Sequence, residues 1–317
     1  MFDWRSAIAA LQAAYSHQDE PAATPPRSIA ASTGAWLRTL PAVPPGGRYF
    51  GAKLMGMAPG APNAGVEYVI VLFDRETSRI AAFVDAEKVT GYRTAATSAA
   101  ALDRMARPHT PKLAVLGSGL EAQMHSRAFA AVRTFEQIAV FSPTPASRER
   151  FVNEIGSELG IETVAAGSAE DAVRGADIVL AAARSHGEQP ILFGDWIKPG
   201  ALTVSIGSTI PQQREIDVSV VSQSDVIVCD MLHEVVSETG DMIAAAQAGV
   251  RLEGKCFSLG DLMSGELAAR LAAAQYPMFK SVGGGLQDVV VAGMILDRAR
   301  EAGVTTALPI SFVTKYV

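Results

Sequence analysis

Short apolar runs alternate with longer amphipathic stretches over the middle of the chain. Runs of four or five apolar residues without alternating polar positions are typical of strands buried on both faces of a parallel sheet. The predicted strands are Leu113–Leu116, Ile138–Phe141, Glu162–Ala165, Ile178–Ala182, Leu202–Ile206 and Val226–Val228, and the predicted helices are Glu121–Val132, Ser147–Leu159 and Ala169–Arg174. This alternation predicts an α/β fold, a doubly wound parallel sheet with right-handed crossovers.

The two ends of the chain follow a different pattern, which predicts a smaller α+β domain. Tyr68–Phe73 and Ile80–Val84 flank a polar loop and predict an antiparallel hairpin. The further elements expected are strands at Trp36–Leu40 and Tyr49–Met57, helices at Thr94–Met105 and Leu286–Ala302, and a strand-prone Thr305–Val317. We therefore predict two domains, residues 1–108 plus 292–317 and residues 109–291.

A glycine-rich turn follows the first strand of the larger domain. It reads Gly-x-Gly-x-x-Ala, and the predicted loop comprises Gly117, Ser118, Gly119, Leu120, Glu121 and Ala122. In this motif one glycine permits a tight turn and the next lets the backbone approach a pyrophosphate at the helix N-terminus. Because a strand precedes the motif and a helix follows it, we favour a Rossmann-type dinucleotide site over a chance turn.

Residues at later strand ends bear on the type of cofactor. Sites for NAD usually place a carboxylate after the second strand, whereas this chain has Ser142, Thr144 and Arg148 before its first acid there, Glu149. Hydroxyls and a guanidinium suit a 2′-phosphate, so NADP is predicted, with NAD as the alternative; a solvated Ser-Thr-Pro turn would also explain the composition. The further contacts expected at strand ends are Ala183, Gly207 and Ser208.

Composition excludes several classes of function. A chain of 317 residues that is 49% hydrophobic can bury a large core, and its net charge of −6 argues against a nucleic-acid partner. No segment reaches the roughly 18 apolar residues of a membrane span, and no signal peptide is evident. Cys229 and Cys256 lack metal-ligand spacing and favour free thiols. We expect a cytoplasmic protein with no metal and no membrane contact.

Isolated cations stand in apolar segments of the smaller domain. They are Arg27, Lys53 and Arg93. Lysine and arginine are rarely buried without a partner, so each cation indicates a bound anion. The alternative is a side chain that reaches back to solvent.

Separated segments of the chain resemble the ornithine cyclodeaminase/mu-crystallin family. They are Pro25-Pro-Arg27, Gly51-Ala-Lys53, Thr90-Gly-Tyr-Arg-Thr-Ala-Ala96, the Gly117 turn, Trp196–Gly200, Ile206-Gly-Ser208, Arg214-Glu-Ile-Asp217, Phe279–Gly283 and Gln287-Asp288. The resemblance implies a homodimer that acts on a small amino or imino acid, whose carboxylate Arg27, Lys53 and Arg93 would hold. Lys53 and Arg93 would be the catalytic residues, and Lys53 would place a proton near the substrate nitrogen. The implied cofactor contacts also include Thr94, Ser281, Val282 and Gly283.

Departures from the family pattern refine the predicted reaction. The family's cyclodeaminases carry an aspartate where this chain has Ser208, and a serine does not accept a proton comparably at neutral pH. The chain is therefore more similar to the ketimine-reductase branch, which implies NAD(P)-dependent reduction of a cyclic imino acid such as pyrroline-2-carboxylate or piperideine-2-carboxylate. Ornithine cyclodeamination, alanine-dehydrogenase-type deamination and a non-catalytic mu-crystallin-like ligand binder remain alternatives. Further departures are Pro143 in place of an arginine, Ala183 in place of a threonine and Gln287 in place of a glutamate.

Three other polar residues receive simpler interpretations. His125 lies on the first helix of the larger domain and is predicted to be a packing residue. Asp230 and Asp241 flank a predicted helix and are interpreted as helix caps.

Overall fold

The computed structural model describes residues 2–17, 20–60, 65–185 and 187–315. The chain forms two compact units, one from Met1–Arg93 with Gly284–Val317 and the other from Thr94–Gly283. These limits differ from residues 108/109 and 291/292, where the sequence pattern places the domain boundaries. The first limit falls inside helix α2 (Glu87–Met105) and the second falls just before helix α11 (Gly285–Glu301). A helix that continues from one unit into the next leaves no loop signal at the boundary.

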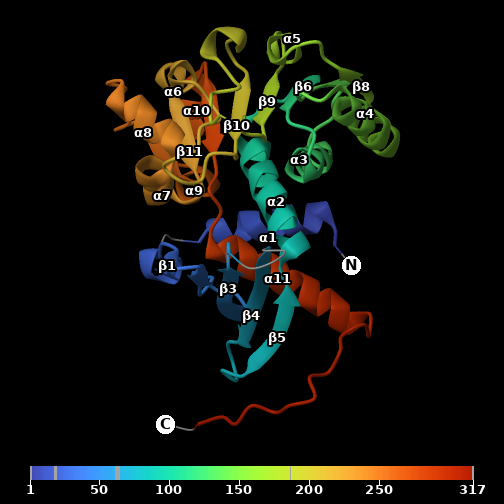
Figure 1. Cartoon of the computed structure of the whole chain (residues 1–317), viewed down its shortest axis with the longest axis vertical. Helices are drawn as coiled ribbons and strands as arrows, with labels where there is room; N and C mark the ends of the chain where they lie inside the picture. Colours follow the sequence, from blue (N-terminus) through green and yellow to red (C-terminus); the bar gives the residue numbers. More distant parts are fainter. Residues whose placement is uncertain (1, 18–19, 61–64, 186, 316–317) are drawn as a thin grey trace. The chain divides into compact units, whose positions relative to one another are not determined.

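The unit Thr94–Gly283 is built on an eight-stranded sheet, shown in Figure 1. Its strands are β6 (Lys112–Leu116), β7 (Gln137–Phe141), β8 (Glu162–Ala165), β9 (Ile178–Ala181), β10 (Leu202–Ser205), β11 (Val226–Cys229), β12 (Cys256–Ser258) and β13 (Pro277–Lys280). Their order is β12-β11-β13-β10-β9-β6-β7-β8, and every pairing is parallel. This confirms the predicted doubly wound sheet.

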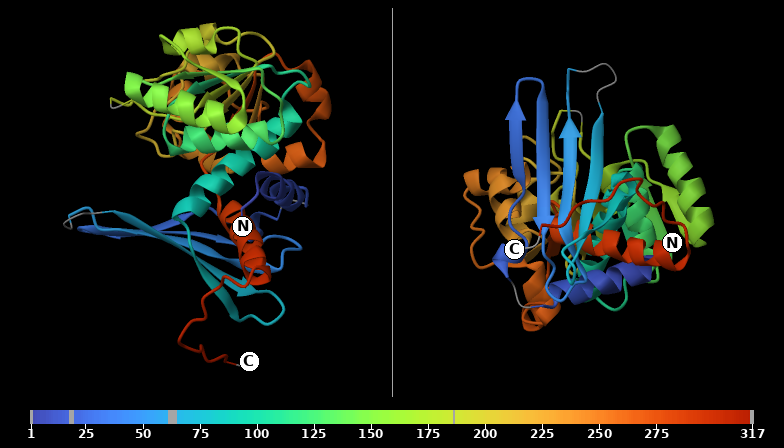
Figure 2. Two further views of the ribbon diagram at one scale, coloured as in Figure 1. Left: turned by 90° about the vertical axis from the view of Figure 1, so that its right-hand side faces the viewer. Right: turned by 90° about the horizontal axis from the view of Figure 1, so that it is seen from below.

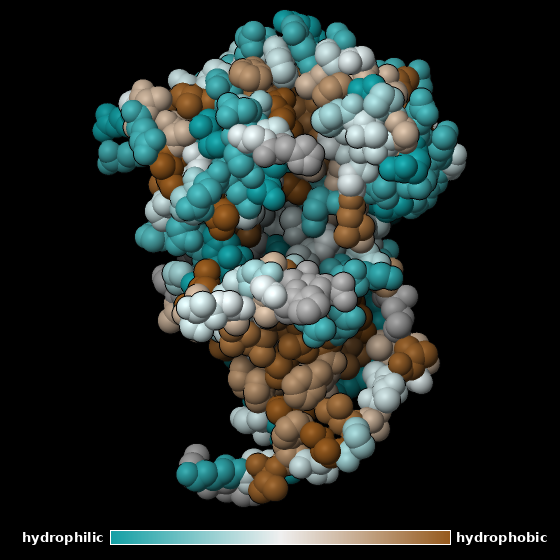
Figure 3. Space-filling view, in the orientation of Figure 1, coloured by the Kyte–Doolittle hydropathy of each residue, from teal (hydrophilic) through white to brown (hydrophobic). Residues whose placement is uncertain are grey.

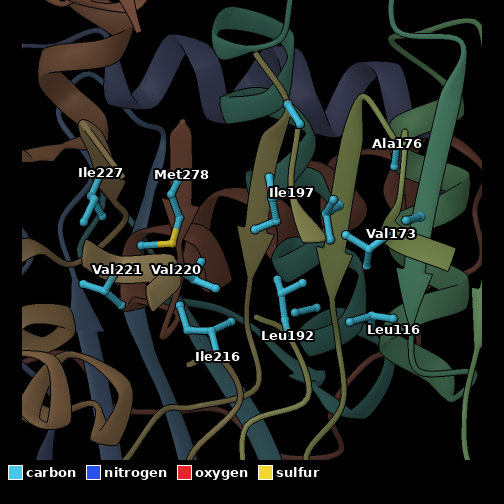
Figure 4. Close-up of a cluster of buried hydrophobic side chains, with 14 of the residues drawn as sticks. Leu116, Val173, Ala176, Leu192, Ile197, Ile216, Val220, Val221, Ile227 and Met278 are labelled. Atoms are coloured by element: carbon cyan, nitrogen blue, oxygen red, sulfur yellow. The ribbon is translucent and has the colours of Figure 1, made fainter. Parts of the chain in front are cut away.

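Helices flank this sheet and enclose its core. They are α3 (Leu120–Ala130), α4 (Pro145–Leu159), α5 (Ala169–Val173), α6 (Val218–Gln223), α7 (Leu232–Glu238), α8 (Gly240–Gln247), α9 (Leu259–Ser264) and α10 (Ala268–Ala273), with a 3₁₀ turn at Gly194–Trp196. Figure 4 shows one part of the core, a cluster of buried side chains that extends across several strands from Met278 through Leu192 to Leu116. All three side chains are almost completely buried. Removing apolar surface from water stabilises the folded chain, so apolar runs such as these favour the interior.

The chain reverses direction across the sheet between β6 and β9. From β6 it proceeds outward through β7 and β8, then returns to place β9 on the other side of β6. Ligands of doubly wound sheets bind beside the carboxyl ends of the strands at such a reversal. The glycine turn that follows Leu116 lies at this position.

The other unit contains a five-stranded antiparallel sheet in the order β1-β2-β3-β4-β5. Its elements are α1 (Trp4–Tyr15), a 3₁₀ turn (Pro21–Ala23), β1 (Ser28–Ser32), β2 (Ala35–Ala42), β3 (Tyr49–Met57), β4 (Val66–Asp74), β5 (Ile80–Asp85), the start of α2, and α11. The predicted hairpin is confirmed as β4 and β5. Figure 2 shows α11 against one face of this sheet, here called the inner face, and α1 packs against α11.

Close packing of α11 on the inner face requires small residues. A Cβ atom on Gly285 would lie 2.5 Å from the carbonyl oxygen of Pro41, and one on Gly293 would lie 2.8 Å from the ring of Tyr49. Both contacts are too short for a side chain, so the glycines let the helix approach β2 and β3. The first turn of α11 is thereby held close to the middle of the sheet.

The opposite face of this sheet, here called the outer face, carries apolar side chains. The β2–β3–β4 register aligns Thr39 with Leu54 and Val69, and these are only partly buried. Leu37 and Phe83 are 46% and 44% exposed. Figure 3 shows hydrophobic side chains over the strands of this unit.

The end of the chain differs from its predicted conformation. Residues 305–315 follow α11 without a strand, and 316–317 lie outside the described residues. β-branched residues favour extended backbone, but a strand also needs a neighbouring edge for its hydrogen bonds. Residues 305–315 do not pair with any of the strands described above.

Candidate active site

A buried ionic cluster lies on the inner face of the five-stranded sheet. The Lys53 Nζ is 2.9 Å from the Asp288 carboxylate, and the Arg93 Nε donates to Asp288 Oδ1 at 3.1 Å. Lys53 and Asp288 are 1% and 0% exposed, so water barely reaches either charge. The structure therefore brings together two of the predicted cations and adds an acid between them.

Three elements supply this cluster. Lys53 lies in the middle of β3, between Leu40 of β2 and Ile70 of β4. Asp288 comes from the first turn of α11, and Arg93 from the second turn of α2. Because the partners of Asp288 are 235 and 195 residues away in sequence, only the folded unit creates the cluster.

Gln287 connects the cluster to α1. Its Oε1 accepts a hydrogen bond from Arg93 Nη1 at 2.9 Å, and its Nε2 donates to the Tyr15 hydroxyl at 3.0 Å. A neutral amide can make both contacts, whereas a glutamate could only accept. Lys53, Arg93, Asp288 and Gln287 together carry one net positive charge, which suits an incoming carboxylate.

The environment of Lys53 changes its acidity. Burial is the main cause that lowers the pKa of Lys53 to about 8, while the negative charge of Asp288 opposes this shift. Arg93 and Arg38 lower the pKa further because they are like charges. Lys53 can therefore gain and lose a proton close to neutral pH.

Arg27 immediately precedes β1 and is partly buried. The β1–β2 register pairs Ser28 with Thr39. One further step in this register places Arg27 opposite Leu40, whose neighbour on β3 is Lys53. If the backbone continues this register, Arg27 lies on the inner face with Lys53, and its anion-binding role stays a prediction.

The glycine turn in the other unit has the geometry expected of a phosphate-binding loop. Gly117 has φ +117°, and a Cβ atom there would lie 2.7 Å from the carbonyl oxygen of Ala182. A Cβ on Gly119 would meet no atom within 4 Å, and no side chain caps α3 at this residue. The N-terminus of α3 therefore leaves space and N–H groups for a phosphate, so the residues present fit a dinucleotide.

The residues after β7 are held together beside this turn. Ser118 Oγ donates to Ser142 Oγ at 3.0 Å, and Arg148 Nη1 donates to the Ser142 carbonyl oxygen at 3.0 Å. The Arg148 guanidinium also lies 5.1 Å from the centre of the Phe141 ring. Thr144 is the N-terminal residue of α4 and makes no side-chain cap there. Three of the predicted cofactor residues, Ser118, Ser142 and Arg148, are therefore in contact with one another.

Glu215 joins the ends of β9 and β10. Its carboxylate accepts hydrogen bonds from the N–H groups of Ala183 at 3.0 Å and Gly207 at 2.9 Å, and from the Ser205 hydroxyl at 2.6 Å. A Cβ on Gly207 would lie 2.3 Å from Glu215 Oε1. Burial raises the pKa of Glu215 to about 7, although Lys280 opposes this shift. In the sequence, Glu215 stands within the Arg214-Glu-Ile-Asp217 motif, and this pattern alone predicts no such role.

Ser208 is completely buried within the same network. Its hydroxyl donates to the Gln213 carbonyl oxygen at 2.7 Å and lies 3.4 Å from the Asp241 N–H group. Its contacts fix the loop after β10, and its predicted contact with substrate or cofactor stays a prediction.

The interpretation of Asp241 as a helix cap is wrong. Its carboxylate is 2.9 Å from Lys280 Nζ and accepts from the N–H groups of Glu215 and Ile216, while Thr239 occupies the N-cap of α8. A fully buried lysine requires such a partner. Asp241 therefore serves the network around Glu215.

Asp230 is not a helix cap either, since Met231 precedes α7. The Asp230 carboxylate accepts from the Ser281 hydroxyl at 2.6 Å and from the N–H groups of Val282 and Gly283 at 3.0 and 2.8 Å. It thereby fixes the segment after β13, which the family resemblance places beside the nicotinamide. The sequence does contain a signal for this role of Asp230, because an acid directly follows the apolar strand β11.

The remaining predicted residues occupy varied positions. Thr94 is buried in α2, Ala122 is buried in α3, and Leu120 is 55% exposed at the first residue of α3. Glu121 follows Leu120 in the first turn. His125 is buried and its ring lies 3.0 Å from the Ser98 hydroxyl, which confirms a packing position. Cys229 and Cys256 are free thiols on adjacent strands.

Within the described ranges, no three His, Cys, Asp or Glu side chains are grouped so that they could hold a metal ion. None of the helices in the described part of the chain is both long and apolar enough to cross a bilayer.

The fold and site together define a two-unit α/β protein with a dinucleotide-type glycine turn and a buried cluster of Lys53, Asp288 and Arg93. A sequence profile of the Ornithine cyclodeaminase/mu-crystallin family matches residues 3–303. The chain belongs to this family, which confirms the resemblance found in the sequence.

Proteins of similar sequence include two kinds of reductase. Ketimine reductase mu-crystallin of Mus musculus is 29% identical over 248 residues, 77% of this chain and 74% of that protein. Delta(1)-pyrroline-2-carboxylate reductase of Paracoccus denitrificans is 27% identical over 301 residues, 92% of each.

Two solved structures are similar over almost the full chain. A probable ornithine cyclodeaminase from Bordetella pertussis has 32% identity and a TM-score of 0.83, covering 95% of this chain and 94% of that one. Delta(1)-pyrroline-2-carboxylate reductase of Thermococcus litoralis, in complex with NADH and L-proline, has 26% identity and a TM-score of 0.85, covering 97% and 96%.

Proposed function

We propose that this protein is an NAD(P)-dependent reductase of a small imino acid. The observation that carries the proposal is the buried Lys53–Asp288–Arg93 cluster, in a chain that also has a fitting dinucleotide turn. Relatives named as ketimine reductase and pyrroline-2-carboxylate reductase support this reaction. Pyrroline-2-carboxylate and piperideine-2-carboxylate are the first substrates to test.

The cations of the inner face have different roles toward the substrate. Arg93 and Arg27 hold the carboxylate, since a guanidinium can make two parallel hydrogen bonds and fix the plane of the group. When bound, the nicotinamide supplies a hydride to the imine carbon. Lys53, whose pKa is lowered to about 8, holds the proton that the nitrogen receives.

Arg148 supports a preference for NADP. Its guanidinium is fixed against the Ser142 carbonyl oxygen and the Phe141 ring, directly after β7. A carboxylate at this position would repel a 2′-phosphate, whereas Arg148 attracts it. NAD remains the second cofactor to test.

Ornithine cyclodeamination is the second candidate, because the Bordetella relative has 32% identity. That reaction needs a base beside the released amine. Ser208 is a poor candidate for this base, since its hydroxyl hydrogen is directed to the Gln213 carbonyl oxygen. Alanine-dehydrogenase-type deamination and simple ligand binding follow as further alternatives.

The deciding experiment follows NADPH and NADH absorbance with pyrroline-2-carboxylate, piperideine-2-carboxylate and pyruvate plus ammonia. It includes ornithine with NAD⁺ and a Lys53→Met variant. We expect rapid oxidation with an imine, and a loss of turnover in Lys53→Met that exceeds its loss of binding. Binding of NADPH without oxidation by any imine would contradict the reductase proposal, and ammonia released from ornithine alone would favour cyclodeamination.

A homodimer is the second part of the proposal, with a second copy of the chain covering the outer face. Leu54 and Val69 are apolar cross-strand neighbours there, and the face would otherwise expose Leu37 and Phe83 to water. Light scattering should give twice the chain mass, and Leu54→Asp should give a monomer. Val304→Asp, at an exposed position after α11, is the control. A monomeric wild type would refute the dimer.

Cytoplasmic location stays a prediction from the sequence.

A further inference from the structure

Arg38 is a cation of the inner face that neither the family resemblance nor the proposed reaction uses. The β2–β3 register pairs Leu40 with Lys53 and Arg38 with Met55. Since alternate residues of a strand point to the same face, Arg38 shares the inner face with Lys53. The two residues are diagonal neighbours on adjacent strands, about 7 Å apart at their Cβ atoms. Long side chains at this spacing can contact the same small molecule.

The guanidinium of Arg38 is held in a defined position. Its Cζ lies 5.6 Å from the centre of the Trp36 ring, and its Nε is buried. Its charge also contributes to the lowered pKa of Lys53, which agrees with their placement on one face.

Arg38 lies beyond the part of the inner face that α11 covers. The helix begins where Gly285 meets the Leu40 and Pro41 backbone, and Leu40 is buried there. Arg38, Trp36 and Met55, further along the same face, are only partly buried. The Arg38 side chain is therefore placed beside the Lys53 cluster rather than beneath the helix.

We propose that Arg38 binds a second carboxylate, carried on the side chain of the substrate, so that the preferred substrate is a dicarboxylic imino acid. This inference rests on the proposed reductase function. The first carboxylate binds at Arg93 and Arg27, and the second pairs with Arg38. The C=N bond takes up one hydride at carbon and one proton at nitrogen, which gives the amine while NAD(P)H becomes NAD(P)⁺.

A planar guanidinium fits this role better than an ammonium group would. It presents paired N–H donors that match the two oxygens of a carboxylate. A substrate with an apolar side chain would leave the Arg38 charge facing that side chain, which costs free energy. The same residue therefore attracts dicarboxylic substrates and disfavours apolar ones.

The test compares two imines that differ by one carboxylate. Oxaloacetate plus ammonia supplies the dicarboxylic imine, and pyruvate plus ammonia supplies its monocarboxylic counterpart, each with NADPH and NADH. Wild type, Arg38→Met, Arg38→Lys and the control Arg79→Met are compared; Arg79 is exposed in the β4–β5 loop. Circular dichroism checks that each variant is folded.

We expect wild-type kcat/KM to be at least about tenfold higher for the dicarboxylic imine. Arg38→Met should lower that value roughly 30- to 100-fold and change the monocarboxylic value less than about threefold. Arg38→Lys should retain part of the preference, and Arg79→Met should retain all of it.

Two results would overturn the inference, and they are distinguishable. Reduction of pyrroline-2-carboxylate or the pyruvate imine without a preference for the dicarboxylic imine, or an equal loss on both in Arg38→Met, refutes the role of Arg38 alone. Absence of oxidation with every imine refutes the proposed reductase function itself.

Discussion

Replacement of Asp288 by asparagine tests whether this carboxylate keeps Lys53 protonated at working pH. The two charged groups are 2.9 Å apart and both are buried. At an effective dielectric constant of 20, two unit charges at this distance attract by about 6 kcal/mol. This value is an upper limit, because an opposite charge within a few ångströms typically shifts a pKa by about 1–3 units.

The direction of the shift follows from the causes that act on Lys53. Burial lowers the pKa of Lys53 to about 8, and Asp288 is the group that opposes burial. Without that charge, the pKa of Lys53 should fall by about 1–3 units. A fall of two units would reduce the protonated fraction at pH 7 from about nine-tenths to about one-tenth. If Lys53 donates the proton, kcat should fall about tenfold at that pH.

The assay is the pH profile of kcat from pH 5 to 10 with a saturating imino acid and NADPH. Wild type should lose activity as pH rises through about 8, and Asp288→Asn should lose it at a lower pH. Activity of Asp288→Asn should recover as pH falls, which general misfolding would not produce. Asp297→Asn is the matched control, because Asp297 lies on the same helix but contacts Tyr49 and Arg48.

The reasoning would be refuted by an alkaline limb at the same pH in both proteins, whatever the change in maximum rate. Suppose that neither Asp288→Asn nor Asp297→Asn shifts the alkaline limb of the kcat profile, and that both lower the maximum rate to a similar extent. This result would indicate that α11 merely supports the fold. A shift in Asp288→Asn alone would identify Asp288 as the group that sets the charge of Lys53.

Three further predictions concern the parallel-sheet unit. Arg148→Gln should raise the KM for NADPH about 10- to 100-fold and leave that for NADH within about threefold, as measured by initial rates. Gly117→Ala should weaken cofactor binding in fluorescence titration, since its Cβ would lie 2.7 Å from the Ala182 carbonyl oxygen. Because the pKa of Glu215 is raised from 4.5 to about 7, its contribution to stability is fully present below about pH 4.5 and is lost as pH rises through 7. Glu215→Gln should remove that dependence and lower the free energy of unfolding by about 1–3 kcal/mol in urea titrations, since it places an NH₂ among N–H donors.

Most of the parallel sheet could be predicted because its signals are local. The expected strand Glu162–Ala165 is observed as β8, and other predicted strands of this sheet are shifted by one residue at most at either end. Strand β13 was missed because Pro277-Met-Phe-Lys280 does not read as a buried strand. Lys280 is tolerated there only because Asp241 and Ser205 contact its ammonium group.

The candidate site could be predicted only in part. The glycine turn is local and was found from its flanking strand and helix. Lys53 and Arg93 were recognised as unusual cations, but no pattern in the sequence joins them to Asp288, which is 235 and 195 residues away. Charge pairs at this separation depend on the folded sheet and on the glycines that admit α11.

Buried acids fix the segments that the proposed function needs. Glu215 holds the ends of β9 and β10, Asp230 holds residues 281–283, and Asp288 holds Lys53 and Arg93. Ligand-binding segments need backbone N–H groups and cations in fixed positions, and apolar packing cannot satisfy either. Carboxylates can, provided that enough donors surround them to offset the loss of water. Because each carboxylate fixes a segment other than its own, changing one should alter the geometry of a site that the acid itself need not touch.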